Sequence, residues 1–568
     1  MIVAEALAAG LQRHGVELIF SQCFPIRTQH VAARFGIRQI GFRTENAGGA
    51  MADGYARMTR RIAVVAAQSG PGATLLVPPL AEAFAASVPL LAIVEESSKS
   101  ESDRNAFQEF DHIKLFESCS KWTRRVDRAD RFDDYLDMAI TRATSGRPGP
   151  VVLILPTNFL SEPAAPSTRT AQLGHFPLDR VLPEQRIIAQ AAALIATADR
   201  PIILAGGGVH LSDAATELVR LAEMTSVPVA TTNMGKGVID ERAPLSLGVF
   251  GNTMARGSLG ASLRTYASEA DLVLLVGTRT NSNGTDSWSL FSKDARFIHI
   301  DMDSGEIGRN YEALRLLGDA KATLSALSAE LANYDFSVRK AGRERIGADI
   351  AAARAAQDAY LDEVGLGRQG AIRPEYMLRV LDAMLRDDDV VVTDASYATN
   401  WVSSFISARG TGARILQPRG LAGLGWGFPL AVGAKLARPA ANVFAIVGDG
   451  GFAHCWSELE TARRLGVNVI TIVLNNQILG YQLHGEEFGY NTHSDAAELG
   501  PVDHAAIALA CGCHGERVAS PAEFKSALER AMVAGRPALI DLLTCADAYP
   551  PINAFERLKR ARAASERS

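Results

Sequence analysis

The stretch Val443-Phe-Ala-Ile-Val447-Gly448-Asp449-Gly450-Gly451-Phe452 decides the fold, because an apolar run ends there in a glycine-rich turn that carries a carboxylate. A second apolar run, Val469–Leu474, ends in Asn475-Asn476, and Asn476 follows Asp449 by 27 residues. Both runs read as buried strands. Since ligands bind beyond the carboxyl ends of parallel strands, two such strands side by side would place Asp449 and Asn476 within reach of one ion.

The residue types at these strand ends suit a divalent cation and a phosphate. A carboxylate, an amide oxygen, a backbone carbonyl and water form the hard oxygen set that Mg²⁺ takes, usually together with a phosphate ligand. Gly448, Gly450 and Gly451 would let backbone N–H groups approach phosphate oxygens, and a helix predicted to start near Ala453 would add its positive N-terminus. The alternative is a tight turn and an unrelated loop asparagine pair. The spacing after two strands favours the metal and phosphate site.

Working outward, apolar β-rich runs alternate with helical stretches three times along the chain, which predicts an α/β protein with three doubly wound parallel sheets. We see no sequence repeat among the three blocks. The predicted strands are Leu18–Ser21, Ile62–Ala66, Leu90–Val94, Val151–Leu155, Pro201–Ala205, Val227–Thr231, Leu272–Gly277, Phe297–Asp301, Val390–Thr393, Val443–Val447, Val469–Leu474 and Ala538–Leu543.

Composition shifts between these blocks predict the domain boundaries. We expect an N-terminal domain over residues 1–165, a central domain over 184–335, a C-terminal domain over 371–548 and a tail over 549–568. A Pro-, Ser-, Thr- and Ala-rich linker, Pro156–Pro183, separates the first two. A charged helical segment from about Val338 to Arg368 separates the last two, and the tail is predicted to end in a short basic helix.

Composition and charge exclude several classes of function. The 568 residues are 47% apolar and 21% charged with a net charge of −5, which is ordinary globular composition without the basic stripe of a nucleic-acid-binding protein. No apolar stretch reaches the roughly 18–20 residues that span a membrane, and the N-terminus does not resemble a signal peptide. Six scattered cysteines do not suggest a disulfide framework. We therefore expect a cytoplasmic protein with no nucleic-acid or membrane partner.

Four further segments, together with the strand ends, resemble the thiamine diphosphate-dependent enzymes. The resemblance covers nearly the whole chain and is strongest to the branch that holds acetolactate synthase, 2-hydroxyacyl-CoA lyase, oxalyl-CoA decarboxylase and pyruvate oxidase. The segments are Gly41-Phe-Arg-Thr-Glu45-Asn-Ala-Gly-Gly-Ala-Met-Ala-Asp-Gly-Tyr-Ala-Arg57, Gln68-Ser-Gly-Pro-Gly-Ala-Thr74, Ala106-Phe107-Gln108-Glu109 and Gly423-Leu424-Gly425-Trp426-Gly427.

The resemblance implies a set of site residues. Asp449, Asn476 and the backbone carbonyl of Ile478 would bind the metal, which bridges to the cofactor diphosphate. Glu45 would be the catalytic acid that hydrogen-bonds the aminopyrimidine ring; the alternative is a charge at a helix N-terminus. Leu424 would be the apolar wedge that bends the cofactor, unless it is a core residue. The remaining implied residues are Phe107 and Gln108 at the substrate and Gly423, Gly448, Gly450, Gly451 and Gly480 at the cofactor.

The resemblance also implies an activity. We expect a non-oxidative lyase or carboligase that acts on a small 2-oxo acid or 2-hydroxy carbonyl compound through ylide and enamine intermediates. Gln108, and with it Gln482 or His484, would handle protons on the substrate side. The first domain of one subunit would meet the third domain of another, so the smallest working unit would be a homodimer, with homotetramers frequent in the branch.

The sequence departs from the family pattern at several positions. The loop Ser21–Arg27, which would wall the substrate pocket, lacks the usual Pro-Gly pair. Ser396-Tyr397 stands where acetolactate synthase has Gln-His to hold the diphosphate, and we expect the hydroxyls or backbone of Ser396 and Tyr397 to bind the cofactor in its place. Acetolactate synthase has a tryptophan that selects the acceptor oxo acid, and the matching position here is about Gly485. In the central domain Thr280–Thr285 replaces the FAD-binding phrase. A flavin-containing synthase or oxidase and a non-catalytic relative therefore remain alternatives.

Overall fold

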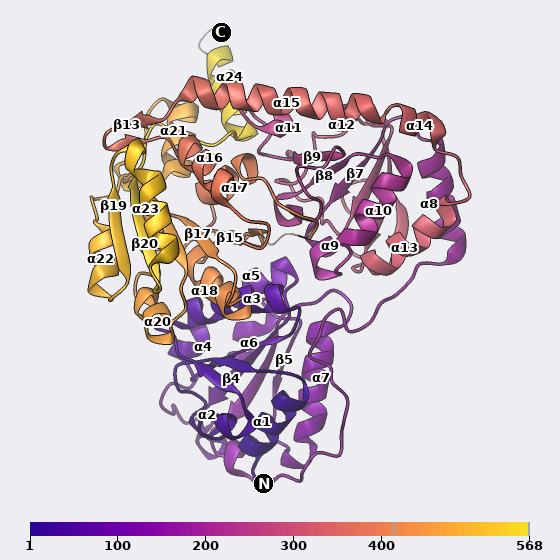
Figure 1. Cartoon of the computed structure of the whole chain (residues 1–568). Coiled ribbons are helices and arrows are strands. Elements are labelled where there is room, and N and C mark those ends of the chain that lie inside the picture. The colour runs from indigo at the N-terminus through magenta and orange to yellow at the C-terminus, as the bar shows by residue number, and fades with distance from the viewer. Residues whose placement is uncertain (413–414, 566–568) are drawn as a thin grey trace.

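Each third of the chain builds one parallel six-stranded sheet in the computed structural model, which describes residues 1–412 and 415–565 (Figure 1). The first sheet has the order β2-β1-β3-β4-β6-β5. Its strands are β1 (Leu18–Phe20), β2 (Arg38–Ile40), β3 (Ala63–Ala67), β4 (Leu90–Glu96), β5 (Trp122–Arg125) and β6 (Val151–Pro156). Its helices are α1 (Val3–Arg13), α2 (Ile26–Ala32), α3 (Glu45–Thr59), α4 (Pro71–Leu75), α5 (Val77–Ala86), α6 (His112–Glu117) and α7 (Phe132–Thr144).

The second sheet has the order β12-β11-β10-β7-β8-β9. Its strands are β7 (Pro201–Ala205), β8 (Val229–Thr231), β9 (Ser246–Val249), β10 (Leu272–Val276), β11 (Arg296–Asp301) and β12 (Leu314–Leu317). The helices around it are α8 (Gln185–Thr197), α9 (Gly207–Leu211), α10 (Ala215–Thr225), α11 (Leu259–Ser262), α12 (Thr265–Ser268), α13 (Ala320–Leu331) and α14 (Ser337–Ala341). The long helix α15 (Arg343–Val364) then runs along one side of the molecule toward the third domain (Figure 1).

The third sheet has the order β16-β15-β17-β18-β20-β19. Its strands are β15 (Val390–Thr393), β16 (Ile415–Leu416), β17 (Val443–Gly448), β18 (Ile470–Asn475), β19 (His514–Val518) and β20 (Ala538–Leu543), and a small hairpin, β13 (Gly367–Arg368) with β14 (Ala371–Ile372), precedes them. Its helices are α16 (Pro374–Met384), α17 (Tyr397–Phe405), α18 (Gly427–Ala437), α19 (Asp449–Phe452), α20 (Glu458–Leu465), α21 (Gly480–Tyr490), α22 (His504–Ala510), α23 (Pro521–Val533) and α24 (Asn553–Ser565).

The three-sheet α/β fold and the twelve predicted strands are confirmed, with ends that differ by no more than two residues. The sequence did not reveal β2, β5, β9, β12, β16 and β19. These six are the two edge strands of each sheet. The charged segment after Val338 forms α14 and α15, and the basic helix of the tail is α24, although residues 566–568 of the predicted tail lie outside the described residues.

One sequence prediction near the site is wrong. The helix expected to start near Ala453 starts at Asp449 instead and ends at Phe452, after a single turn. The carbonyl oxygen of Asp449 accepts a hydrogen bond from the Ala453 amide, so Ala453 is the residue that closes the helix. Two consecutive glycines, Gly450 and Gly451, are poor helix formers, which agrees with so short a helix.

Helices α3 and α18 join the first domain to the third at very close range. A Cβ atom on Gly54 would collide with the carbonyl of Leu430, and one on Gly433 would collide with the carbonyl of Met51. The start of α3 is held by Glu458 on α20, whose carboxylate accepts the backbone N–H groups of Arg43 at 3.0 Å and Thr44 at 3.1 Å. This contact fixes where Glu45 begins its helix.

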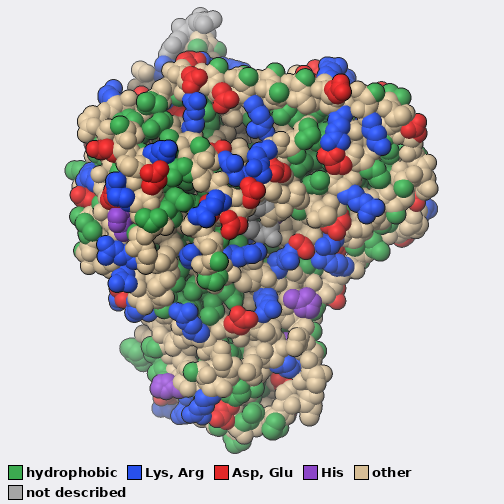
Figure 2. All heavy atoms as spheres, viewed as in Figure 1, with side chains coloured by type: hydrophobic (Ala, Val, Ile, Leu, Met, Phe, Trp, Pro, Cys, Tyr) green, Lys and Arg blue, Asp and Glu red, His purple; other side chains and the backbone are tan. Residues whose placement is uncertain are grey.

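The surface agrees with the charge pattern of the sequence. Lys and Arg side chains are intermixed with Asp and Glu side chains over the face shown in Figure 2, with no continuous basic stripe on it. Across residues 1–412 and 415–565, helices long enough to cross a bilayer are not apolar enough to do so.

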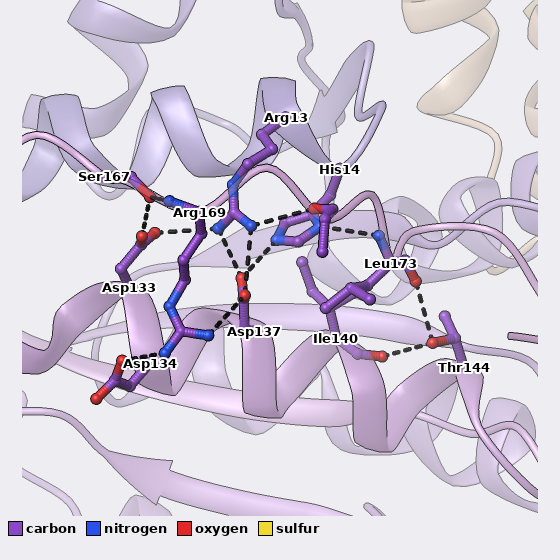
Figure 3. A network of polar contacts seen from close by, with 11 residues as sticks. Arg13, His14, Asp133, Asp134, Asp137, Ile140, Thr144, Ser167, Arg169 and Leu173 are labelled. Carbon is purple, nitrogen blue, oxygen red and sulfur yellow. Dashed lines mark hydrogen bonds and ion pairs between the residues drawn. The ribbon is translucent and has the colours of Figure 1, made fainter.

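A buried ion-pair network ties α1 to α7 at the far end of the first domain (Figure 3). The Asp137 carboxylate accepts hydrogen bonds from Arg13 at 2.6 Å and from Arg169 at 3.1 Å. His14 lies between Asp137 and a backbone amide: its Nε2 is 2.9 Å from Asp137, and its Nδ1 accepts the Leu173 N–H at 3.1 Å. The backbone contact makes Nδ1 an acceptor, so Nε2 carries the proton.

Replacing Asp137 by Asn should lower the free energy of unfolding by on the order of 2–3 kcal/mol, because it leaves two arginines without their shared carboxylate. Burial raises the pKa of Asp137, but Arg13 and His14 outweigh burial and hold the pKa below its ordinary 3.8. The stabilisation is therefore complete above pH 3.8 and is lost as the pH falls through the lowered value. Urea unfolding of D137N and wild type at neutral and acid pH measures this.

The difference in the free energy of unfolding between wild type and D137N should become smaller at acid pH. A matched Asp130→Asn variant, which removes a mostly exposed carboxylate paired with Arg128, should change stability little at either pH. An equal gap at both pH values for D137N would contradict this account.

Candidate active site

The ends of β17 and β18 lie side by side in the third sheet. The strands pair in parallel with Gly448 opposite Leu474, so the residues that follow them emerge at the same edge. The Gln477 backbone N–H donates to Asp449 Oδ2 at 2.7 Å and joins the two strand ends directly. Asp449 begins the one-turn helix α19, and Asn476 follows β18. The structure thus brings together the two elements that the sequence set 27 residues apart.

A cavity of about 610 Å³ opens at this edge of the sheet. It is lined by the predicted residues of the third domain apart from Gly423 and His484. The lining includes Ser396, Tyr397, Leu424, Gly448, Asp449, Gly450, Gly451, Asn476, Ile478 and Gly480, together with Asp394 and Gln482. Gly423 does not line the cavity, and a Cβ atom on it would lie 2.6 Å from the Trp426 ring.

The oxygen atoms around Asp449 fit a hard divalent cation. Its carboxylate is 7% exposed, accepts the N–H groups of Gly450 and Gln477, and has no ion-pair partner among the described residues. Burial raises the pKa of Asp449 to about 6. The carboxylate, the Asn476 amide oxygen and the Ile478 carbonyl are the donor types that Mg²⁺ accepts in an incomplete protein shell with phosphate and water.

Two glycines keep the cavity wall close to the strand ends. A Cβ atom on Gly451 would collide with the Asp394 carboxylate, and one on Gly480 would lie 2.7 Å from the Tyr397 ring. Side chains at either position would push the wall inward or displace these neighbours. Glycine at these two positions therefore lets the backbone pack directly against Asp394 and Tyr397.

Asp394 is a site residue that the sequence analysis did not assign. It follows β15 and is almost fully buried, and its carboxylate accepts the N–H groups of Gly425 at 3.0 Å, Trp426 at 3.2 Å and Gly427 at 3.3 Å. Burial raises its pKa, and these amides oppose the rise. An aspartate directly after an apolar strand was the available signal, the same one that identified Asp449.

Glu82 holds the other side of the same turn from the first domain. This buried carboxylate on α5 accepts the N–H groups of Gly420 at 2.7 Å, Leu421 at 2.6 Å and Ala422 at 3.2 Å. Burial raises the pKa of Glu82, and the Arg57 guanidinium and the amides oppose that rise. No local sequence pattern predicts the role of Glu82, because its hydrogen-bond partners lie more than 330 residues away in the sequence. Leu424 therefore sits between two carboxylate-anchored segments.

Tyr397 meets His484 rather than open solvent. Its hydroxyl is 2.7 Å from His484 Nδ1, and the two rings stack with centroids 5.9 Å apart. Burial raises the pKa of Tyr397 and lowers that of His484. Ser396 precedes α17 with a φ of 61°. Both residues of the pair that replaces Gln-His line the cavity, with the Tyr397 hydroxyl already bonded.

The predicted residues of the first domain lie apart from this cavity. Glu45 is the first residue of α3 and is 9% exposed, and within the described residues its carboxyl has no hydrogen-bond or ion-pair partner. Gln108 is hydrogen-bonded to Gln68, and the Phe107 side chain is 86% exposed. None of these three lines the cavity at Asp449. Within one chain, the structure therefore does not bring the predicted site residues of the first domain together with those of the third domain.

A second cavity, of about 1150 Å³, lies on the central domain where the FAD alternative would place a nucleotide. Its walls include Gly207, Gly208, Gly277, Arg279 and the segment around Asn281–Gly284. Burial lowers the pKa of Arg279, and the neighbouring Arg147 lowers it further. The charged groups of the wall are mixed, with Arg147, Arg279 and Arg419 beside Asp301, Glu306 and Asp319, and its glycines expose backbone.

Sequence comparison gives one family across the chain. The domain described as "Thiamine pyrophosphate enzyme, N-terminal TPP binding domain" matches residues 1–115, the "central domain" matches 188–327 and the "C-terminal TPP binding domain" matches 394–542. Thiamine pyrophosphate is a synonym of thiamine diphosphate. The last match contains the Asp449 and Asn476 strand ends.

Curated relatives agree over nearly the full length. The "Probable acetolactate synthase large subunit" of Methanocaldococcus jannaschii is 33% identical over 98% of this chain and 94% of its own. The "Acetolactate synthase" of Arthrospira platensis is 31% identical over 97% and 95%, and the "Acetolactate synthase, chloroplastic" of Arabidopsis thaliana is 31% identical over 95% and 81%. The chain therefore belongs to the thiamine diphosphate-dependent enzyme family, within its acetolactate synthase-like carboligase branch.

Proposed function

We propose that this enzyme makes or breaks the carbon–carbon bond next to the carbonyl of a small 2-oxo acid or 2-hydroxy carbonyl compound, without net oxidation. The observation that carries the proposal is the cavity in which Asp449, Asn476 and Ile478 offer oxygen ligands beside glycine backbone. Thiamine diphosphate, when bound, supplies a carbon nucleophile and an electron sink for the bond that breaks. The names of the relatives make acetolactate synthesis the first reaction to test.

Asp449, Asn476 and the Ile478 carbonyl would hold Mg²⁺ and, through it, the diphosphate. The backbone of Gly448, Gly450, Gly451 and Gly480 would leave room for the phosphate oxygens, and Ser396 and Tyr397 line the same cavity. This division of labour is usual for Mg²⁺, which binds few protein ligands and keeps phosphate and water in its shell.

Leu424 would support the bent cofactor from below, and the Gly423 carbonyl would accept a hydrogen bond from the exocyclic amine. The rigid turn supports this assignment, because Glu82 and Asp394 accept six backbone N–H groups from residues 420–427 between them. Charge-assisted hydrogen bonds of this kind are about twice as strong as neutral ones. A leucine side chain held in a fixed turn could keep the reacting groups of the bound cofactor close to each other.

Glu45 would hold a proton on its carboxyl oxygen against the aminopyrimidine ring. Near-complete burial and the lack of a protein partner among the described residues support this role, since the carboxyl is free to bond a ligand. Gln108 and Phe107 would face the substrate. Because these residues do not line the cavity of their own chain, we propose that a second copy supplies them, which makes the working unit a homodimer or a homotetramer.

A test of the function is turnover by purified protein with thiamine diphosphate, Mg²⁺ and a panel of 2-oxo acids, singly and in pairs. Release of carbon dioxide together with a new carbon–carbon product supports a carboligase, and release alone supports a decarboxylase. A flavin-dependent activity is the second candidate, because the cavity at the central domain exposes glycine backbone at Gly207, Gly208 and Gly277. A yellow chromophore that copurifies with the protein would support it.

Substituting Gln for Glu45 should lower kcat by about 10²–10⁴-fold, because the amide cannot give or take the proton that a positioned acid handles. Thiamine diphosphate affinity should stay within about threefold of wild type, since the proposed ligands of the metal and the diphosphate all belong to the third domain. Steady-state kinetics and calorimetry measure the two effects. An exposed carboxyl of the same domain, Glu17, provides the control E17Q, and full turnover by E45Q would refute the role.

Replacing Asp394 by Ala should weaken thiamine diphosphate binding by about 10–100-fold, the usual loss when a residue that orients a binding group is removed. The physical reason is that Gly425, Trp426 and Gly427 lose the carboxylate that fixes the turn. The control is Asp388→Ala, in the exposed turn before the same strand. Unchanged affinity in D394A, measured by calorimetry, would contradict the proposed part of this turn in cofactor binding.

A further inference from the structure

A buried histidine, His112, lies directly beneath the glycine-proline loop of the first domain. Its side chain is fully buried at the start of α6. The Gly70 backbone N–H donates to its Nε2 at 3.1 Å, and its Nδ1 is 3.2 Å from Glu96 Oε1 at the end of β4. Arg125 completes the row by donating to both Glu96 oxygens, at 2.6 and 2.7 Å.

These contacts determine where the imidazole carries its proton. A backbone N–H can only donate, so Nε2 must be the acceptor and cannot carry a proton. Burial raises the pKa of Glu96, but the hydrogen bonds from His112 and Arg125 outweigh burial and lower the pKa overall. Glu96 is therefore a carboxylate that only accepts, and Nδ1 must donate to it. His112 is held as the neutral tautomer protonated on Nδ1.

The loop that His112 anchors controls the conformation of Gln108. Ser69 Oγ donates to the Gln108 carbonyl at 2.7 Å, and the Gln68 amide bonds the Gln108 side chain. Gln108 has a φ of 61°, in the left-handed region that a non-glycine residue adopts only when its surroundings hold it there. Gly70 itself has a φ of 63° and lies against Gln108.

The same loop also touches Glu45. A Cβ atom on Gly72 would lie 3.0 Å from Glu45 Oε1, so the loop backbone passes directly over the carboxyl. Gly72 follows Gly70 at the start of α4. A loop shift at Gly70 would therefore be felt at both proposed reacting residues of the first domain, Gln108 and Glu45.

We propose that His112, with its proton fixed by Glu96 and Arg125, is a positioning residue that holds the Gln68–Gly72 loop and thereby the Gln108 side chain at the substrate. The inference rests on the proposed function for the part that concerns substrate. The loop contacts can be tested without any substrate.

The chain contains a matched control. His14 is buried to 3% exposure and also bridges a backbone N–H, that of Leu173, to a carboxylate, that of Asp137 (Figure 3). It precedes β1 and so lies at the amino edge of the sheet, whereas Gly70 follows β3 at the carboxyl edge. A general cost of removing a buried histidine should appear at both positions, and a cost specific to the loop only at His112.

The experiment compares His112→Phe and His112→Gln with His14→Phe and His14→Gln. Phe keeps the ring and removes the acceptor, whereas Gln can place a carbonyl oxygen near Nε2 and accept the Gly70 N–H. Hydrogen exchange of peptides spanning residues 68–76, measured without substrate, should speed up by at least about tenfold in H112F and should stay near wild type in both His14 variants.

Kinetics with the best 2-oxo acid give the second measurement. In H112F, kcat/KM should fall by at least about tenfold while thiamine diphosphate affinity stays within about threefold of wild type. H112Q should restore most of the kcat/KM and most of the slow hydrogen exchange of the loop. If H112F does not fold, Glu96→Gln takes its place, because it removes the charge that keeps the proton on Nδ1. That variant should also expose the loop amides to exchange.

Turnover by wild-type protein tests the proposed function separately, before any variant is compared. If wild-type protein turns over, two results for H112F would overturn the positioning role. One is hydrogen exchange of the loop at the wild-type rate, and the other is faster exchange of the loop with an unchanged kcat/KM. Equal losses in H14F and H112F would overturn it as well, since the effect would then belong to any buried histidine. Faster loop exchange with a kcat/KM loss confined to His112 supports it.

Discussion

The structure depends on the pairing of two strand ends, where a backbone N–H after β18 bonds the carboxylate after β17. Parallel strands must end at the same edge, so Asp449 and Asn476 are brought together by the sheet and not by a flexible loop. The cation site that we propose there would be preorganised: its ligands would lie close together before binding, so the free energy of cation binding would not be spent on ordering them. The rest of the third domain serves to keep the cavity beside these strands open and its walls fixed.

Buried carboxylates bonded to backbone amides are the main device for fixing those walls. Asp394 and Glu82 hold the turn on both sides of Leu424, and Glu458 holds the start of α3 before Glu45. Glu82 crosses from the first domain to the third, and Glu458 in the opposite direction, so the relative position of these domains is encoded in hydrogen bonds as well as in the close approach of α3 and α18. Buried charges cost free energy unless they are bonded, and here each accepts at least two N–H groups.

The parts of the fold that sequence revealed are those buried on both faces. Interior strands such as β6 and β17 are continuous apolar runs, whereas edge strands such as β5, Trp-Thr-Arg-Arg, and β19, His-Gly-Glu-Arg-Val, are more exposed and resemble polar loops in the sequence. The site shows the same limit. Asp449 was predictable because its signal is local, a strand followed by a glycine turn. Glu82 and His112 act on partners distant in sequence, and only the folded chain shows them.

Calorimetric titration of thiamine diphosphate into the metal-depleted protein, with and without added Mg²⁺, tests the central claim most directly. If the strand ends bind the diphosphate through one cation, thiamine diphosphate binding should require Mg²⁺. An Asp449→Ala variant should then bind thiamine diphosphate at least about 100-fold more weakly, with an unchanged midpoint of thermal unfolding. Binding that is equally tight in the presence of a chelator, or undiminished in the variant, would contradict the account.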